Sequence, residues 1–112
     1  MIHKLRLNKE PFDSIKSGMK TIEMRLYDEK RQMIKVGDKI EFALRDDETQ
    51  TILCEVKGLT TYKNFEELYL NNDKVALGYK PNEVASSDDM NQFYSIQEQK
   101  QYGVVAIKVQ LI

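Results

Sequence analysis

The chain has 112 residues, of which 41% are hydrophobic and 31% are charged, and its formal net charge is -1. This length predicts a single domain over residues 1–112, and the composition excludes a disordered chain and the strongly basic class that coats nucleic acid. No apolar run approaches the roughly 18–20 residues of a membrane span, and the N-terminus lacks the apolar core of a signal peptide. We therefore expect a cytoplasmic protein that does not interact with membranes.

The chain contains one cysteine and one histidine, and these numbers limit its chemistry. They exclude an internal disulfide, a zinc site of cysteines and histidines, and the usual Ser-His-Asp arrangement. Cys54 and His3 both lie on apolar sides of predicted strands, so we interpret them as core residues. Because no metal-binding spacing or glycine-rich phosphate loop is present, we expect no metal and no cofactor.

Alternation of apolar and polar residues predicts five strands. They lie at residues 2–8, at 21–26, around 40–44, around 52–56 with a bend past Gly58, and at 104–111. Short helical pieces are predicted at 11–18, at 27–31, at 64–70 with Asn64 as its cap, and in the 73–101 segment, where Ser87 or Asp88 caps a piece that runs towards Tyr94. The polar residues 46–49 predict a hairpin loop. Together these elements predict an α+β fold in which a small curled sheet or barrel carries short helices.

Basic residues are concentrated in the first part of the chain. Residues 1–45 contain eleven Lys and Arg against seven Asp and Glu, a net of +4, whereas residues 46–112 contain six against eleven, a net of -5. Such a distribution suits a local positive cleft for a small anion or nucleotide, although charges also fluctuate along any sequence.

The segment 18–25 brings several chemically active groups together. Thr21, Glu23 and Arg25 alternate with Ile22, Met24 and Leu26, so we expect the first three to face outward and the other three to face the core. Lys20 enters the same strand. The cluster would then present an ammonium, a hydroxyl, a carboxylate and a guanidinium to one small volume. The alternative is a solvated strand face on which Glu23 pairs with Lys20 or Arg25.

Five tyrosines are candidates for stacking on a nucleic-acid base, or else core and rim residues. They are Tyr62, Tyr69, Tyr79, Tyr94 and Tyr102. Tyr94 is the one that we single out, because it follows Phe93 in an otherwise polar segment.

The pattern Gly18-x-Lys20-Thr21-x-Glu23-x-Arg25 resembles the signature of the ASCH domain family. Further landmarks of the same resemblance are Pro11-Phe12, Val36-Gly37-Asp38 and Tyr102-Gly103-Val104-Val105. The resemblance covers essentially the whole chain. It implies a PUA-like β-barrel and a cleft that binds RNA or a modified nucleotide, with Lys20, Glu23 and Arg25 at its floor.

On this interpretation Thr21 also binds the ligand, Lys30 and Arg31 help to hold phosphate, and Tyr94 stacks on a base. Enzymatic relatives imply an alternative, an amidohydrolase that acts on an acylated nucleoside such as N4-acetylcytidine, with Lys20 and Glu23 as catalytic groups. The threonine that those enzymes carry three positions after the lysine is replaced here by Glu23. A metal-dependent ribonuclease and a protein-interaction domain with a vestigial pocket are weaker alternatives.

Overall fold

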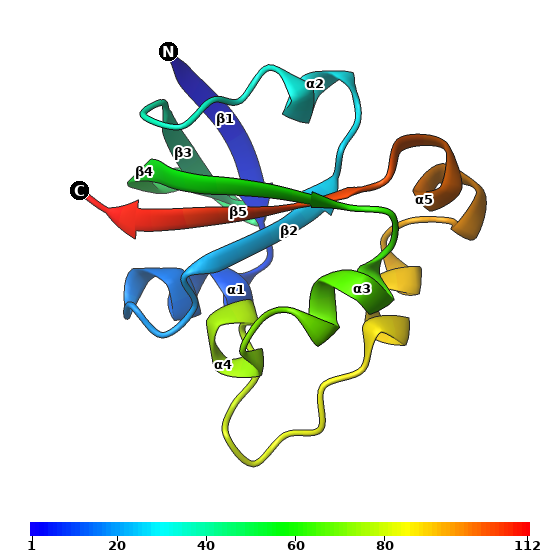
Figure 1. The fold of residues 1–112 in the computed structure, drawn as a ribbon. Coiled ribbons are helices and arrows are strands. Elements are labelled where there is room, and N and C mark those ends of the chain that lie inside the picture. The colour runs from blue at the N-terminus through cyan, green and yellow to red at the C-terminus, as the bar shows by residue number, and fades with distance from the viewer.

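The structure is a computed structural model that describes all residues, 1–112, as five strands with short helices in the connections (Figure 1). The strands are β1 (Ile2–Leu7), β2 (Ile22–Leu26), β3 (Lys39–Leu44), β4 (Asp47–Tyr62) and β5 (Val104–Leu111). The helices are α1 (Lys9–Lys16), α2 (Glu29–Gln32), α3 (Phe65–Leu70), α4 (Lys74–Leu77), the 3-10 helix η1 (Ser87–Gln92) and α5 (Ile96–Tyr102). The predicted α+β fold is confirmed. No helix has the length and apolar character needed to cross a membrane.

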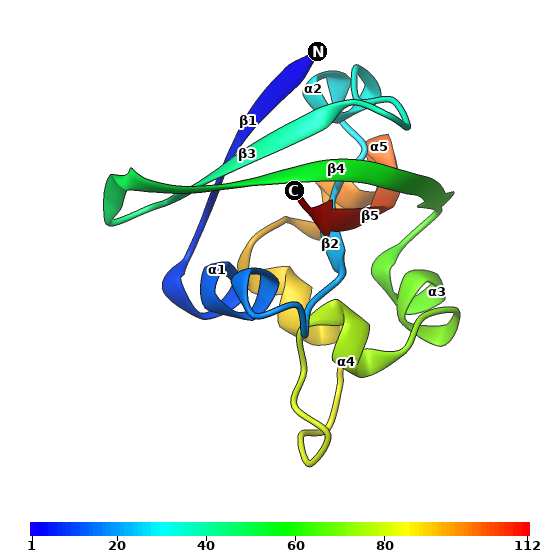
Figure 2. The ribbon, with the colours of Figure 1, turned by 90° about the vertical axis from the view of Figure 1, so that its left-hand side faces the viewer.

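The strands form one mixed sheet in the order β1-β3-β4-β5-β2, in which only β1 and β3 run parallel. The long strand β4 pairs with β3 through its first half and with β5 through its second half. A register shift between Val56 and Gly58 bends β4 where its partner changes. The sequence predicts a bend at this place, past Gly58. The sheet therefore curls into a half-barrel (Figure 2).

The two edge strands β1 and β2 face each other across the open side of the half-barrel. Arg25 on β2 donates a hydrogen bond from Nη2 to the carbonyl oxygen of Arg6 on β1, at 2.8 Å. The Arg25 side chain thus joins β1 and β2, which do not pair through backbone hydrogen bonds, and the space beside this contact stays open.

Two hydrophobic clusters cover the two faces of the sheet. The larger has fourteen buried residues inside the half-barrel, including Phe42, Val105 and Ile107. The smaller has seven, which come from β2, β5 and the helical segment 65–90. They are Met24, Phe65, Leu68, Leu77, Met90, Val104 and Ala106.

The predicted orientation of β2 is right for its apolar face, which packs on the core, and wrong for Glu23 and Arg25, which were expected to face outward. Glu23 and Arg25 lie opposite Ile107 and Val105 of β5, so these two polar side chains share a face with the larger cluster. Met24 packs into the smaller cluster on the other face. The alternation assumed one covered and one exposed face, but the helical segment covers the second face as well. Glu23 is consequently only 4% exposed.

Element ends differ from the sequence predictions by a few residues. Helix α1 begins at Lys9, two residues before Pro11. The proline is tolerated inside the helix because it lies in the first turn, where the backbone N–H groups have no partner within the helix. The hairpin turn is at Arg45 and Asp46, and β4 already begins at Asp47. The cap of η1 is Ser86, not Ser87 or Asp88. Asn64 caps α3 as predicted, its side chain accepting from the backbone N–H of Glu67 at 2.9 Å.

Candidate functional site

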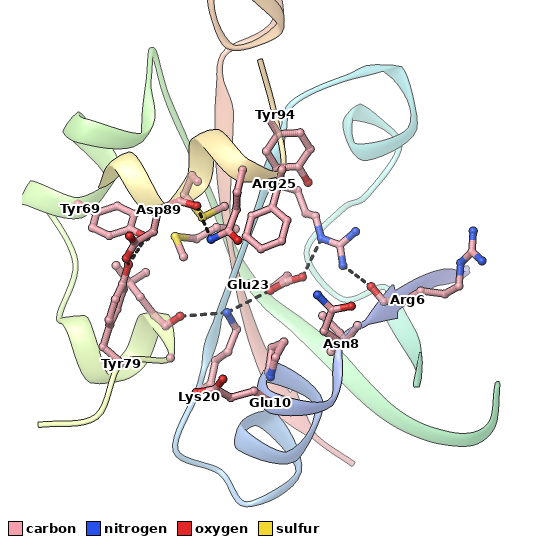
Figure 3. Close-up of a pocket in the computed structure, with 18 of the residues that line it drawn as sticks. Arg6, Asn8, Glu10, Lys20, Glu23, Arg25, Tyr69, Tyr79, Asp89 and Tyr94 are labelled. Carbon is pink, nitrogen blue, oxygen red and sulfur yellow. Dashed lines mark hydrogen bonds and ion pairs between the residues drawn. The ribbon is translucent and has the colours of Figure 1, made fainter. Parts of the chain in front are cut away.

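A cavity of about 520 Å³ opens between the edges of β1 and β2 and the chain segment 69–94 (Figure 3). This volume is typical of sites that hold one small molecule. Lys20, Glu23, Arg25, Arg31 and Tyr94 line the cavity. It thereby contains five of the seven side chains that the sequence singles out.

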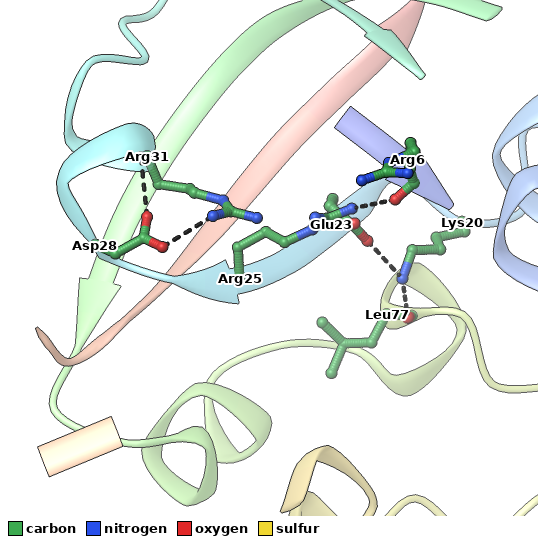
Figure 4. Close-up of polar contacts among 7 residues, drawn as sticks. All are labelled: Arg6, Lys20, Glu23, Arg25, Asp28, Arg31 and Leu77. Atoms are coloured by element: carbon green, nitrogen blue, oxygen red, sulfur yellow. Dashed lines mark hydrogen bonds and ion pairs between the residues drawn. The ribbon is translucent and has the colours of Figure 1, made fainter. Parts of the chain in front are cut away.

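Lys20, Glu23 and Arg25, which we call the motif wall, form a continuous chain of ion pairs (Figure 4). Lys20 Nζ lies 3.2 Å from Glu23 Oε1, and Arg25 Nε lies 2.7 Å from Glu23 Oε2. All three side chains are largely buried, with exposed fractions of 7% for Lys20, 5% for Glu23 and 11% for Arg25. Both oxygens of the carboxylate are therefore engaged with cations.

Burial and charge act in opposite directions on the motif wall. Burial alone would raise the pKa of Glu23, but the neighbouring Lys20 and Arg25 outweigh it and hold the pKa below its usual value. Burial likewise opposes the charge on Arg25, yet the contact with Glu23 leaves the Arg25 pKa raised. Both groups are therefore charged at neutral pH.

The backbone around α4 fixes the position of Lys20. Its Nζ donates to the carbonyl oxygen of Leu77, the last residue of α4, at 3.0 Å. Gly78 then adopts φ +114°, and a Cβ at that position would lie 3.1 Å from Lys20 Cδ. Glycine is thus needed here both for the left-handed conformation and for the close approach of the lysine.

Arg31 enters the cavity from α2. Its Nη1 pairs with Asp28 Oδ2 at 2.9 Å, while the same carboxylate caps the helix by accepting from the Arg31 backbone N–H (Figure 4). The Nε of Arg31 is buried and has no hydrogen-bond partner in the protein. Such an unsatisfied donor is unusual in a native structure.

Tyr94 lies against Phe65 of the smaller cluster, with ring centroids 5.9 Å apart and planes 15° apart. Burial raises the pKa of its hydroxyl, although the nearby Arg25 and Arg31 act to lower it. One face of Tyr94 is thus already occupied by Phe65, and the ring lines the cavity next to the Arg25 side chain (Figure 3).

Tyr69, Tyr79 and Asp89, which we call the tyrosine wall, line the opposite side of the cavity (Figure 3). The Tyr79 hydroxyl donates to Asp89 Oδ2 at 2.6 Å, and the hydroxyls of Tyr69 and Tyr79 are 2.9 Å apart. The sequence indicates these two tyrosines only as members of a larger set, and it gives no indication of Asp89. Their proximity depends on the path of an irregular segment, which no local pattern reveals.

Two candidate residues do not line the cavity. The backbone N–H of Thr21 donates to the carbonyl oxygen of Ala76 at 3.0 Å, but its side chain is not among those around the cavity. Lys30 is exposed and also lies outside the lining, whereas its neighbour Arg31 is part of it. A four-residue helix turns successive side chains about 100° apart, so the two cannot share a direction.

Of the two residues that were predicted to lie in the core, Cys54 does so, whereas His3 is only partly buried and contacts Asp38. Cys54 is fully buried in the larger cluster, and burial raises the pKa of its thiol to about 11. The His3 side chain is 8% exposed, and its Nε2 lies 2.8 Å from Asp38 Oδ2. Neither residue lines the cavity.

The donor set of the cavity suits an anionic or polar organic ligand. No group of three or more His, Cys, Asp or Glu side chains that could hold a metal ion is present. Lys20 uses two of its three N–H donors, and Arg25 uses two of its five. One donor on Lys20 and three on Arg25 therefore remain for a ligand.

Comparison with known proteins identifies structural relatives of the whole chain. The crystal structure of the hypothetical protein PH0355 is 36% identical over the full length of both chains, with a TM-score of 0.85. The solution structure of protein PF0455 from Pyrococcus furiosus is 32% identical, covers all of this chain and 98% of its own, and gives a TM-score of 0.69. A search of curated proteins found no match.

A more distant likeness shows the fold alone. The crystal structure of the S128A mutant of ZmASCH from Zymomonas mobilis is 15% identical and gives a TM-score of 0.61, covering 97% of this chain and 67% of that one. A family model for the ASCH domain matches residues 5–112. Since that match leaves out only the first four residues and includes the entire cavity lining, the protein belongs to the ASCH domain family, whose fold is PUA-like.

Proposed function

We propose that the protein binds a nucleotide, either free or as part of an RNA, in the cavity between the motif wall and the tyrosine wall. Lys20, Glu23 and Arg25 form the floor, Arg31 contacts phosphate, and Tyr94 borders the base. Lys30, outside the lining, adds only to the positive potential at the entrance. The family membership and the size of the cavity support this proposal.

One observation carries the proposal more than the others. Lys20 and Arg25 are largely buried cations that keep N–H donors without a protein partner, and the Nε of Arg31 is buried with no partner at all. All three side chains line a cavity of about 520 Å³. A buried donor without a partner, such as Arg31 Nε, is costly unless a ligand or water completes it. A phosphate or a base edge supplies the acceptors that are missing.

The state of Glu23 favours binding over proton transfer. An amidohydrolase in which Glu23 activates water would need a carboxylate with a free oxygen and a pKa near the working pH. Glu23 instead has both oxygens in ion pairs and a lowered pKa. It therefore acts as a positioning group that orients the two cations. We expect chromatography to show N4-acetylcytidine unchanged after incubation with the protein.

The direct test is a calorimetric titration with cytidine 5′-monophosphate and with a short single-stranded RNA at low salt. We expect Arg25→Gln to weaken binding by about tenfold or more, because charge-assisted contacts to phosphate contribute roughly 1.5–3 kcal/mol. Affinity for the RNA should fall as salt is added. Lys57→Gln is the matched control, since Lys57 pairs with Glu55 on an exposed surface outside the cavity.

Absence of binding to either probe at low salt would contradict the proposal. Equal affinity of the wild type and a folded Arg25→Gln variant would show that the ligand binds elsewhere on the protein.

A further inference from the structure

The cavity is electrically divided between its two walls. Arg25 stands on the side of β2, whereas Asp89 stands on the opposite side with Tyr69 and Tyr79 (Figure 3). Arg31, from α2, also lines the cavity. The only carboxylate on the motif wall, Glu23, is fully paired with cations. Glu10 and Glu83 also line the cavity, from α1 and from the segment after α4, so Asp89 is the carboxylate of the tyrosine wall in particular. A ligand that reaches from Arg25 to Asp89 therefore meets donors at one end and an acceptor at the other.

Asp89 is held in place by the two tyrosines of its wall. Three separate segments contribute to the arrangement, because Tyr69 lies on α3, Tyr79 follows α4 and Asp89 lies on η1. The Tyr79 hydroxyl donates to Asp89 Oδ2 at 2.6 Å, and it also lies 3.2 Å from the carbonyl oxygen of Ser86. No protein group donates to the second oxygen, Oδ1. Asp89 is an exposed residue of the cavity lining, so Oδ1 remains available as an acceptor while Tyr79 holds Oδ2.

The donors and acceptors on the tyrosine wall determine which ligand groups can bind to it. Burial and the contacts with Asp89 and Tyr69 raise the pKa of Tyr79, so its hydroxyl stays protonated and remains a donor at neutral pH. The Asp89 carboxylate that receives this hydrogen bond offers only acceptors. A ligand group that faces Asp89 must therefore carry an N–H or O–H.

We propose that Asp89, positioned by Tyr79, makes the cavity selective for nucleotides whose base carries an exocyclic amine. The inference rests on the proposed function, since it assumes that the other end of the nucleotide occupies the motif wall. Cytosine presents an amino donor at the position where uracil presents a carbonyl acceptor. The amino group of cytosine would donate a hydrogen bond to Asp89 Oδ1, whereas the carbonyl oxygen of uracil would face it with a second acceptor.

Calorimetric titrations with cytidine 5′-monophosphate and uridine 5′-monophosphate test this selectivity, because the two probes differ at that position of the base. We expect the wild type to bind the cytidine nucleotide about tenfold more tightly. Asp89→Asn should reduce the ratio of affinities to within about twofold, because the new amide can donate to the uracil carbonyl. Tyr79→Phe should lower the ratio partially, because the carboxylate loses the group that orients it.

Asp88→Asn is the matched control, because Asp88 is the preceding acidic residue on η1 but does not line the cavity. It should leave the ratio unchanged, and circular dichroism should show that all variants are folded. Equal binding of the two probes by the wild type, or an unchanged ratio in Asp89→Asn, would overturn the selectivity while leaving the proposed function intact. Failure of both probes to bind would overturn the proposed function as well.

Discussion

The two walls of the cavity are built in different ways. The motif wall comes from residues 20–25, and the strand β2 that carries Glu23 and Arg25 is hydrogen-bonded to β5. The tyrosine wall comes from residues 69–89, which lie on and between three short helices packed over a cluster of seven buried residues. The cations Lys20 and Arg25 therefore lie on β2 or directly before it, whereas the tyrosine hydroxyls and the Asp89 carboxylate lie on the irregular part. We infer that affinity depends on the first wall and selectivity on the second.

The largest effect is expected from breaking the motif wall at its centre. Glu23→Ala would leave Lys20 and Arg25 buried without a counter-charge, which typically costs about 3–5 kcal/mol. Urea unfolding would show this as a lower midpoint. A loss below about 1 kcal/mol would mean that water reaches both cations.

Glu55→Ala provides the comparison for that variant. Glu55 pairs with Lys57 at 3.2 Å, a distance like that of Lys20 to Glu23, but both side chains are more than 40% exposed. An exposed pair contributes only about 0–1 kcal/mol. Burial, and not the presence of an ion pair, is then what separates the two variants.

A smaller effect is expected at the contact between the walls. Gly78→Ala introduces a Cβ 3.1 Å from Lys20 Cδ at a positive φ, so it should destabilise the protein by about 1–3 kcal/mol and weaken cytidine 5′-monophosphate binding. Gly37→Ala has a similar positive φ but no atom within 4 Å of the new Cβ. It should share the backbone strain and keep the affinity of the wild type. If both variants bind equally well, the position of Lys20 does not depend on Gly78.

The smallest effect concerns the pH dependence of stability. Because the folded-state pKa of Glu23 lies below its ordinary value of 4.5, its contribution is fully present above about pH 4.5 and is lost as the pH falls through the folded pKa. The free energy of unfolding should therefore decrease less steeply below pH 4.5 in Glu23→Gln than in the wild type. Some slope should remain, since Asp38 and Asp47 also have lowered pKa values. If the free energy of unfolding fell with the same slope below pH 4.5 in the two proteins, the charge assignment of Glu23 would be contradicted.

Local patterns predict the motif wall and the strands because their causes are local. Alternation places the strands, and the spacing of Lys20, Glu23 and Arg25 brings the three groups to one strand. Their exposure was predicted wrongly, because alternation separates the two faces of β2 but cannot reveal that both faces are covered. Asp89 was missed for the same reason, since only the tertiary path of residues 69–89 brings it to Tyr79.

The central claim is that one nucleotide occupies the space between the two walls, and a nuclear magnetic resonance titration of the backbone amides with cytidine 5′-monophosphate tests it most directly. We expect chemical-shift changes to concentrate at residues 20–25 and 78–94, the segments that line the cavity from its two sides. Shifts confined to another surface, or no shifts at millimolar nucleotide, would contradict the claim.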